Sequence, residues 1–181
     1  MGKDKLLVFD LDETLIHSTK MPLDIKENFI YENYFVYKRP GLDSFIMECA
    51  KHFSIAIWSS AEDDYVNSIV KGTIPLNIEL EFIWGRSECW LKVAKVKDAD
   101  TGLTTKEYQN IKPLEKIRRK GFKLKNLLII DDSAFKVIDN KKSYLIIKPF
   151  EGEQSDREFE FLFNKIGDFW GMKNDDKYEF K

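Results

Sequence analysis

The stretch Leu6-Leu7-Val8-Phe9-Asp10-Leu11-Asp12-Glu13-Thr14 decides the fold of this chain. Its first four residues are apolar and long enough for a short buried strand, and acids follow at once. A strand that is apolar throughout is typical of a parallel sheet covered by helices on both faces. A second stretch of the same design, Leu127 to Ile130, ends in Asp131-Asp132-Ser133.

Apolar strand candidates alternate with amphipathic segments along the rest of the chain. This pattern predicts an α/β fold with a mainly parallel central sheet flanked by helices. The expected strands are 5–9, 34–38, 53–58, 81–84, 127–130 and 143–148, and the expected helices are 42–49, 62–71, 113–120 and 155–170. Segment 34–38, the helix after it and segment 53–58 are expected to form one strand-helix-strand unit. Gly72 is a plausible stop for the second helix.

A more polar region interrupts this alternation. Segments 91–97 and 103–108 flank the turn Asp98-Ala99-Asp100-Thr101-Gly102, which predicts a β-hairpin. We therefore expect one domain over residues 1–181, with a small β insertion at about residues 85–110. The chain has 181 residues, 43% of them hydrophobic, which suffices for one sizeable core.

The composition of the chain limits the partners and the cellular compartment that we expect for it. Lys and Arg number 29 against 31 Asp and Glu, so no excess positive charge is available for the backbone of a nucleic acid. Cys49 and Cys89 lack disulfide or zinc spacing, and no apolar run approaches the ~18 residues of a membrane span. We expect a monomeric, soluble cytoplasmic protein with no nucleic-acid or membrane partner, and a nuclear location is open for a eukaryotic host.

The acids after the two apolar strands are the candidate functional site. In open α/β sheets, ligands bind beyond the carboxyl ends of the strands, so Asp10, Asp12, Asp131 and Asp132 would converge if the two strands are neighbours. Clustered carboxylates repel one another unless a cation lies among them, and Mg2+ prefers oxygen ligands. The alternative is that these acids cap helices and form turns. The complete run 9–15 together with a second acidic strand end favours the metal hypothesis.

The string Val8 to Ser18 contains a DxDxT core that resembles the first motif of the haloacid dehalogenase superfamily. The fuller string DLDETLIHS is similar to the subgroup of small phosphatases named for the carboxy-terminal domain of RNA polymerase II, also called NLI-interacting-factor-like. Further matches follow in the family order and cover most of the chain: Lys38-Arg39-Pro40-Gly41, Ser59, Tyr65, Gly85-Arg86-Ser87-Glu88-Cys89, Lys112 and Asp131-Asp132-Ser133.

The resemblance implies a Rossmann-like fold and a phosphatase mechanism that needs Mg2+. Asp10 would be the nucleophile that forms an aspartyl-phosphate, and Asp12 the general acid and then the general base. Asp10 and Asp131 would bind the metal, and Asp12 would do so through its backbone carbonyl. Asp132 would be a second ligand or would orient one.

Three further residues would bind the phosphate by the same resemblance. Ser59 and Lys112 would supply a hydroxyl and an ammonium group to the charge that spreads over the phosphoryl oxygens, and Thr14 would support the turn through its hydroxyl. Taken singly, Ser59 is more typical of a cap and Lys112 of a solvated helix start. Two departures stand out, because many relatives have Thr in place of Ser59 and close relatives often have Asn in place of Asp132.

The segments between the motifs indicate what kind of substrate could reach the site. Only residues 19–41 separate the first motif from the next helix, too few for a separate cap domain, and an open site admits large substrates. Arg86 and Tyr65 are candidates for substrate contact. Phe29, Tyr31, Tyr34 and Val36, with the insertion, form either an apolar groove beside the phosphate or part of the core. A phosphoserine or phosphothreonine in a protein or peptide is the favoured substrate class.

Two other functions stay open from the sequence. One is a non-catalytic protein-interaction module that keeps the fold. The other keeps the chemistry but acts on a small molecule such as a sugar phosphate, or on a nucleic-acid end, which the charge balance disfavours. A separate hypothesis gives His17 a structural hydrogen bond in place of a role in acid-base catalysis.

Overall fold

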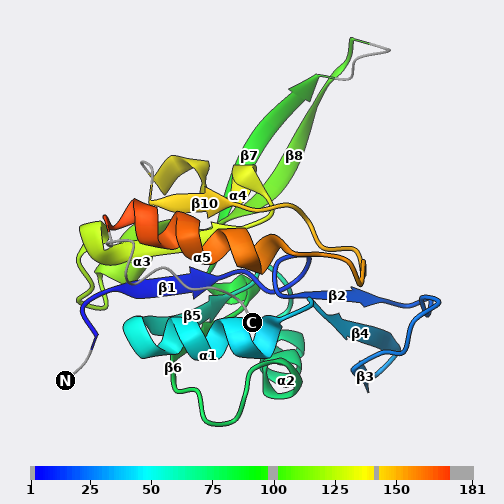
Figure 1. The fold of residues 1–181 in the computed structure, drawn as a ribbon. Coiled ribbons are helices and arrows are strands. Elements are labelled where there is room, and N and C mark those ends of the chain that lie inside the picture. The colour runs from blue at the N-terminus through cyan, green and yellow to red at the C-terminus, as the bar shows by residue number, and fades with distance from the viewer. Residues whose placement is uncertain (1–2, 98–101, 141–142, 172–181) are drawn as a thin grey trace.

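The fold is built on a five-stranded parallel sheet with the strand order β10-β9-β1-β5-β6 (Figure 1). The computed structural model describes residues 3–97, 102–140 and 143–171, without the side chains of 95–97. The sheet strands are β1 (Leu6–Phe9), β5 (Ser54–Trp58), β6 (Leu80–Trp84), β9 (Leu127–Asp131) and β10 (Tyr144–Ile146). The helices are α1 (Leu42–His52), α2 (Asp63–Thr73), α3 (Leu114–Arg118), α4 (Ala134–Val137) and α5 (Glu158–Phe169).

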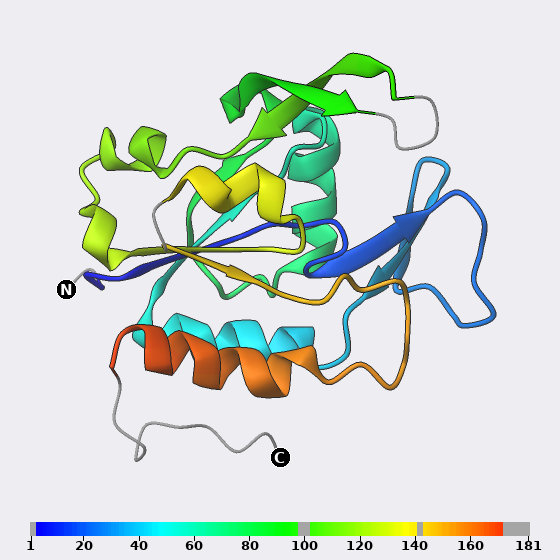
Figure 2. The same cartoon turned by 90° about the horizontal axis from the view of Figure 1, so that it is seen from above.

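Alternating side chains of β1 divide the core between the two faces of the sheet. Leu7 and Phe9 belong to a large cluster with apolar residues of α1, α2 and α5. Leu6 and Val8 belong to a smaller cluster with residues of α3 and α4. Figure 2 shows α1 and α5 on one side of the sheet and α3 and α4 on the other. The predicted fold class, a central parallel sheet flanked by helices, is confirmed.

A second, antiparallel sheet lies beside the carboxyl end of β1. It has the order β2-β4-β3, with β2 at Ile16–Thr19, β3 at Phe29–Tyr31 and β4 at Tyr34–Lys38. The prediction that segment 34–38 belongs to a strand-helix-strand unit of the main sheet is wrong, because β4 pairs with β2 and β3. In the main sheet, β5 pairs with β1 and not with β4.

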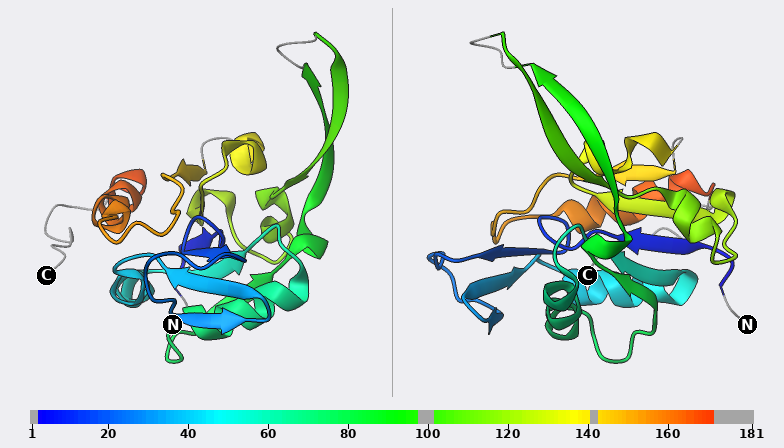
Figure 3. Two further views of the ribbon diagram at one scale, coloured as in Figure 1. Left: turned by 90° about the vertical axis from the view of Figure 1, so that its right-hand side faces the viewer. Right: turned by 180° about the vertical axis from the view of Figure 1, so that it is seen from behind.

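The predicted hairpin is present as β7 (Trp90–Lys97) and β8 (Thr104–Ile111), while its turn at 98–101 lies outside the described residues. Figure 3 shows the two strands extending away from the body of the molecule. Lys112, which is predicted to bind the phosphate, follows β8 directly, so the base of the hairpin fixes its position.

Gly72 does not end a helix, so that prediction is wrong. Helix α2 continues through it to Thr73, and a Cβ atom at Gly72 would lie 2.8 Å from the ring of Phe29. The glycine therefore permits close packing of β3 on α2. The predicted strand 143–148 is shorter than expected, and the last helix begins at Glu158. Among the described residues, no helix combines the length and the hydrophobicity needed to cross a bilayer.

Candidate active site

Two strand ends meet at the centre of the site. The register of β1 and β9 pairs Phe9 with Ile130, so that Asp10 and Asp131 follow side by side. The backbone N–H of Asp10 donates to the carbonyl of Ile130 at 2.9 Å, which extends the pairing by one residue. Both aspartates are buried. The expected convergence of the two acidic strand ends is present in the structure.

A buried lysine bridges these two carboxylates. The Nζ atom of Lys112 lies 2.5 Å from Oδ1 of Asp10 and 2.6 Å from Oδ2 of Asp131. Although burial opposes it, the charge of these two aspartates raises the pKa of Lys112. Asn140 holds this segment, because its Nδ2 donates to the carbonyl of Lys112 at 2.8 Å and its Oδ1 accepts the N–H of Leu114 at 2.9 Å. Lys112 is therefore a fixed, charged donor beside the proposed nucleophile.

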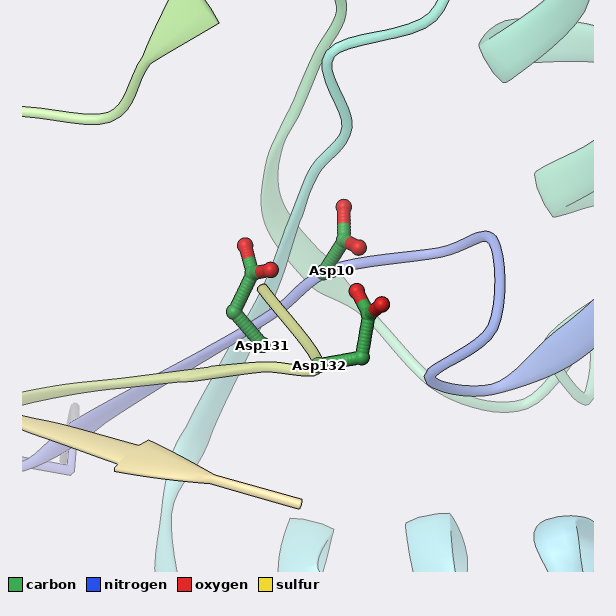
Figure 4. A group of neighbouring side chains, drawn as sticks. All are labelled: Asp10, Asp131 and Asp132. Carbon is green, nitrogen blue, oxygen red and sulfur yellow. The ribbon is translucent and has the colours of Figure 1, made fainter. Parts of the chain in front are cut away.

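Three carboxylates form a group that suits a hard cation. Oxygen atoms of Asp10, Asp131 and Asp132 all lie within 4.8 Å of one another, and Figure 4 shows the three carboxylates on the same side of the strand ends. The Oδ1 atom of Asp132 is buried and accepts no hydrogen bond from the described residues. Oxygen ligands in this arrangement fit Mg2+. The expected ligands are Asp10, Asp131 and the backbone carbonyl of Asp12. Asp132, expected as a ligand or as a residue that orients one, stands close enough to be a ligand.

The pKa values of Asp10 and Asp131 shift in opposite directions. Burial, together with the neighbouring Asp10 carboxylate, raises the pKa of Asp131 to about 6. Burial also disfavours the charge of Asp10, yet the ammonium groups of Lys112 and Lys136 hold the pKa of Asp10 below its usual value. The proposed nucleophile is therefore kept ionised, as attack on phosphorus requires.

Asp12 belongs to a different network from the three acids. Its Oδ1 accepts a hydrogen bond from the hydroxyl of Tyr65 at 2.6 Å and another from Oγ of Ser18 at 3.3 Å. Oγ of Ser59 lies 3.4 Å from its Oδ2. Burial raises the pKa of Asp12, while the Tyr65 hydrogen bond opposes the rise. A carboxyl group with a raised pKa suits a general acid, the role expected for Asp12.

Lys136 was not foreseen from the sequence. Its Nζ lies 3.4 Å from Asp10, 3.6 Å from Asp131 and 3.7 Å from Asp132. The charges of these three carboxylates raise the pKa of Lys136 despite its burial. The available signal was its position four residues after Asp132, in the short segment that follows the second acidic strand end.

The two predicted hydroxyl residues have different surroundings. Oγ of Ser59 faces Asp12 and accepts the N–H of Ala61 at 3.0 Å. Thr14 is fully buried, and its Oγ1 makes no hydrogen bond with a described residue. The turn at Thr14 is therefore held by backbone hydrogen bonds such as that from Leu15 N–H to the carbonyl of Leu11, and the expectation that the Thr14 hydroxyl supports the turn is wrong.

A cleft of about 470 Å³ opens beside Asp12. Both residues proposed to contact substrate, Tyr65 and Arg86, line it, and the Arg86 guanidinium pairs with Glu62. The remaining lining residues are Ser18, Tyr31, Glu32, Tyr34, Ala61, Glu62 and Asp64. Of the four residues considered for an apolar groove, Tyr31 and Tyr34 line this cleft. The other two serve the interior, because Val36 is buried in the core and Phe29 packs against Gly72.

The fold and the site define an α/β protein of the haloacid dehalogenase type, with paired acids at the ends of two adjacent strands. Two solved structures of the RNA polymerase II CTD phosphatase Fcp1 share the fold, one of them a fission yeast variant bound to beryllium fluoride. Their TM-scores are 0.55 and 0.57 at 17% sequence identity, over 96% of this chain and 52% and 51% of theirs.

The chain belongs to the NLI interacting factor-like phosphatase family, whose profile matches residues 5–175. Curated relatives include a probable C-terminal domain small phosphatase of Dictyostelium discoideum, 26% identical over 91% of this chain. CTD small phosphatase-like protein 3 of Caenorhabditis elegans is 38% identical over 35% of the chain, and nuclear envelope morphology protein 1 of Saccharomyces cerevisiae is 29% identical over 53%. The matched parts make up 50%, 24% and 25% of these relatives.

Proposed function

We propose that this chain is a Mg2+-dependent phosphatase that forms an aspartyl-phosphate on Asp10. One observation carries the proposal: the buried Asp10 carboxylate lies at a strand end, with the Lys112 ammonium 2.5 Å from its Oδ1. A carboxylate that is kept ionised beside a fixed cation is suited to attack a phosphate monoester, because the cation offsets charge on the phosphoryl oxygens. Membership of a phosphatase family supports the same chemistry.

The proposed reaction has two steps. In the first, an oxygen of Asp10 bonds to phosphorus, the bond from phosphorus to the leaving oxygen breaks, and Asp12 gives that oxygen a proton. In the second, Asp12 takes a proton from water, the water oxygen bonds to phosphorus, and the phosphorus–Asp10 oxygen bond breaks to release phosphate. Tyr65 and Ser18 hold the Asp12 carboxyl in place for both transfers.

The remaining residues bind the phosphate and the metal. Lys112 and the hydroxyl of Ser59 would contact phosphoryl oxygens. The carboxylates of Asp10 and Asp131 would hold Mg2+ together with the backbone carbonyl of Asp12, and Asp132 stands next to them. A bound Mg2+ would neutralise charge on the phosphate. Thr14 is buried in the turn after Asp12, so we assign it no contact with phosphate.

The favoured substrate is a phosphoserine or phosphothreonine in a protein or peptide. The cleft beside Asp12 is open on one side to solvent-exposed residues such as Glu32 and Asp64, so a chain could lie across it. Only the small sheet β2-β4-β3 lies between β1 and α1, where a larger cap would restrict access. The names of two curated relatives, a CTD small phosphatase-like protein and a probable C-terminal domain small phosphatase, support a protein substrate.

The test is hydrolysis of p-nitrophenyl phosphate and of a phosphoserine peptide array by the purified chain. We expect turnover that requires Mg2+, is abolished by EDTA and is inhibited by beryllium fluoride. Asp10→Asn should remove it, whereas Asp43→Asn, an exposed aspartate of α1 paired with Lys38, should not change it. Full activity of Asp10→Asn would refute the proposed nucleophile, and full activity in EDTA would refute the metal.

A further inference from the structure

Lys136 contacts every member of the acid group formed by Asp10, Asp131 and Asp132. Its Nζ lies 3.4 to 3.7 Å from one oxygen of each. Lys112, by comparison, contacts two of the three at 2.5 and 2.6 Å. With three carboxylates and two ammonium groups, the group keeps one negative charge in excess. Lys136 thus supplies half of the positive charge that holds the three acids together.

The backbone fixes the position of Lys136 even though α4 is short. Its N–H donates to the carbonyl of Ser133 at 3.1 Å, and its carbonyl accepts the N–H of Lys112 at 2.8 Å. One hydrogen bond therefore joins the backbones of the two lysines. The side chain is 15% exposed, so that it lies at the solvent side of the three buried or nearly buried acids.

The side-chain contacts of Lys136 are those of a replaceable cation. Two of its three distances, to Asp131 and Asp132, are longer than a hydrogen bond. The buried Oδ1 of Asp132 faces Lys136 at 3.7 Å and accepts no hydrogen bond from a described residue. Lys136 is thus held by charge more than by directed bonds, and a second cation can take over part of that charge balance.

We propose that Lys136 is the resident counter-cation of this acid group and competes with Mg2+ for it. It is a positioning residue: it keeps Asp10 and the metal ligands ionised and close together, and its ammonium repels a metal ion bound to the same carboxylates. The inference rests on the proposed function, because it takes Asp10 and Asp131 as metal ligands. It adds that this chain holds Mg2+ more weakly than the same three acids would without Lys136.

The test is isothermal titration of MgCl2 into the purified chain and into Lys136→Met. The neutral variant should bind Mg2+ about tenfold more tightly, because a unit charge a few ångströms from a divalent ion is repelled by about that amount even in water. Lys136→Arg keeps the charge and should bind like the wild type. Lys165→Met removes a lysine paired with Glu158 on α5 and should also leave the affinity unchanged. Equal or weaker binding by Lys136→Met would overturn the inference.

Two further measurements keep the outcomes separate. Should Lys136→Met not fold, Lys136→Gln offers a neutral polar side chain with the same expected change in affinity. The rise of Tm with MgCl2 gives an independent readout, since a ligand that binds the folded state stabilises it according to its affinity. Absence of Mg2+ binding by the wild type and by both neutral variants would refute the proposed metal site itself, whereas binding by the wild type without tightening in either neutral variant would refute only the role of Lys136.

Discussion

Two buried charged centres in the described part of the chain are built differently. In the arginine centre, the guanidinium of Arg39 makes two parallel 2.8 Å hydrogen bonds to Asp156 and donates to the carbonyls of Thr14 and Lys148. The rings of two phenylalanines lie 5.5 Å from it. In the acid centre, Asp10, Asp131 and Asp132 outnumber Lys112 and Lys136. The charges of the first centre are balanced and hydrogen-bonded, whereas the second keeps one negative charge in excess and a buried carboxylate oxygen that accepts no hydrogen bond within the described part of the chain.

The direction of each pKa reflects this difference. Although burial opposes it, the hydrogen bonds from Arg39 hold the pKa of Asp156 below its usual value. Burial, with the charge of Asp10, instead raises the pKa of Asp131 to about 6. A satisfied ion pair supports the fold, and a centre with excess charge is typical of a binding or catalytic site. Mutations should therefore separate the two centres by what they affect.

The largest effect should come from Asp12→Asn, which changes the proposed general acid two residues after Asp10 of the acid centre. Loss of the general acid should lower turnover of a phosphoserine peptide by about 10⁴-fold, at the upper end for proton transfer. Turnover of p-nitrophenyl phosphate should fall much less in the first step, because p-nitrophenolate leaves without a proton. The measurement is the rate of the first step for both substrates, from single-turnover kinetics, because the second step is common to both and also uses Asp12. An equal loss in that first step would assign Asp12 to binding instead of proton transfer to the leaving group.

The next largest effect should be on stability, in Arg39→Met. Removal of one partner leaves Asp156 buried without its cation, which should lower the free energy of unfolding by about 3–5 kcal/mol. Lys38→Met removes the neighbouring lysine, whose partner Asp43 is exposed, and should cost about 1 kcal/mol or less. Urea denaturation of the three chains measures both changes. A loss at Arg39 no larger than at Lys38 would remove the distinction between the two centres.

The position of the acid centre could be predicted from the sequence, but that of the arginine centre could not. Asp10 and Asp131 directly follow apolar strands, and parallel strands end at the same edge of a sheet. Arg39 and Asp156 are 117 residues apart, and no periodic pattern joins them. Lys136 lies in a four-residue helix, too short for a helical pattern, and only its i+4 spacing from Asp132 gave a signal.

The sequence also could not show which strands belong to the same sheet. The segment 34–38 has the composition of a strand, but its partners β2 and β3 lack the run of four buried apolar residues that marks β1. Without these partners, the sequence predicts a strand-helix-strand unit of segments 34–38 and 53–58. Gly72 was misread for a similar reason, because its role depends on Phe29, which reaches it across the fold from β3. Local patterns identified the elements, whereas long-range contacts decided their neighbours.

A smaller effect should appear in the pH dependence of Asp131→Asn in EDTA. The pKa of Asp131 is higher in the folded chain, about 6, than in the unfolded chain, about 4. Its contribution to stability is thus fully present below the unfolded value and lost as the pH rises through 6. Between about pH 4 and pH 7.5, the unfolding free energy of the variant should therefore rise by roughly 2 kcal/mol relative to that of the wild type.

Urea denaturation of the metal-free wild type and Asp131→Asn across this pH range measures that gain. A difference that stays constant with pH would mean that the acid centre carries no unfavourable charge. It would then resemble the arginine centre, and the contrast between the two would fail.

One residue pair lies between Asp12 and the arginine centre. His17 Nδ1 lies 2.9 Å from both carboxylate oxygens of Glu13, and its ring stacks on Tyr37 at 6.4 Å. Glu13 follows Asp12 in the chain, and its carbonyl accepts the N–H of Phe150, one of the rings beside the guanidinium of the arginine centre. The pair has the directed hydrogen bond expected of a structural role.

The smallest effect should therefore come from His17→Ala. Loss of one half-buried hydrogen bond should lower the free energy of unfolding by about 1 kcal/mol, with turnover of p-nitrophenyl phosphate within about twofold of the wild type. Urea denaturation and kcat, measured on the same preparation, give the two numbers. A large fall in kcat with unchanged unfolding would place His17 with the acid centre, because a residue that only supports the fold cannot change turnover while the fold keeps its stability.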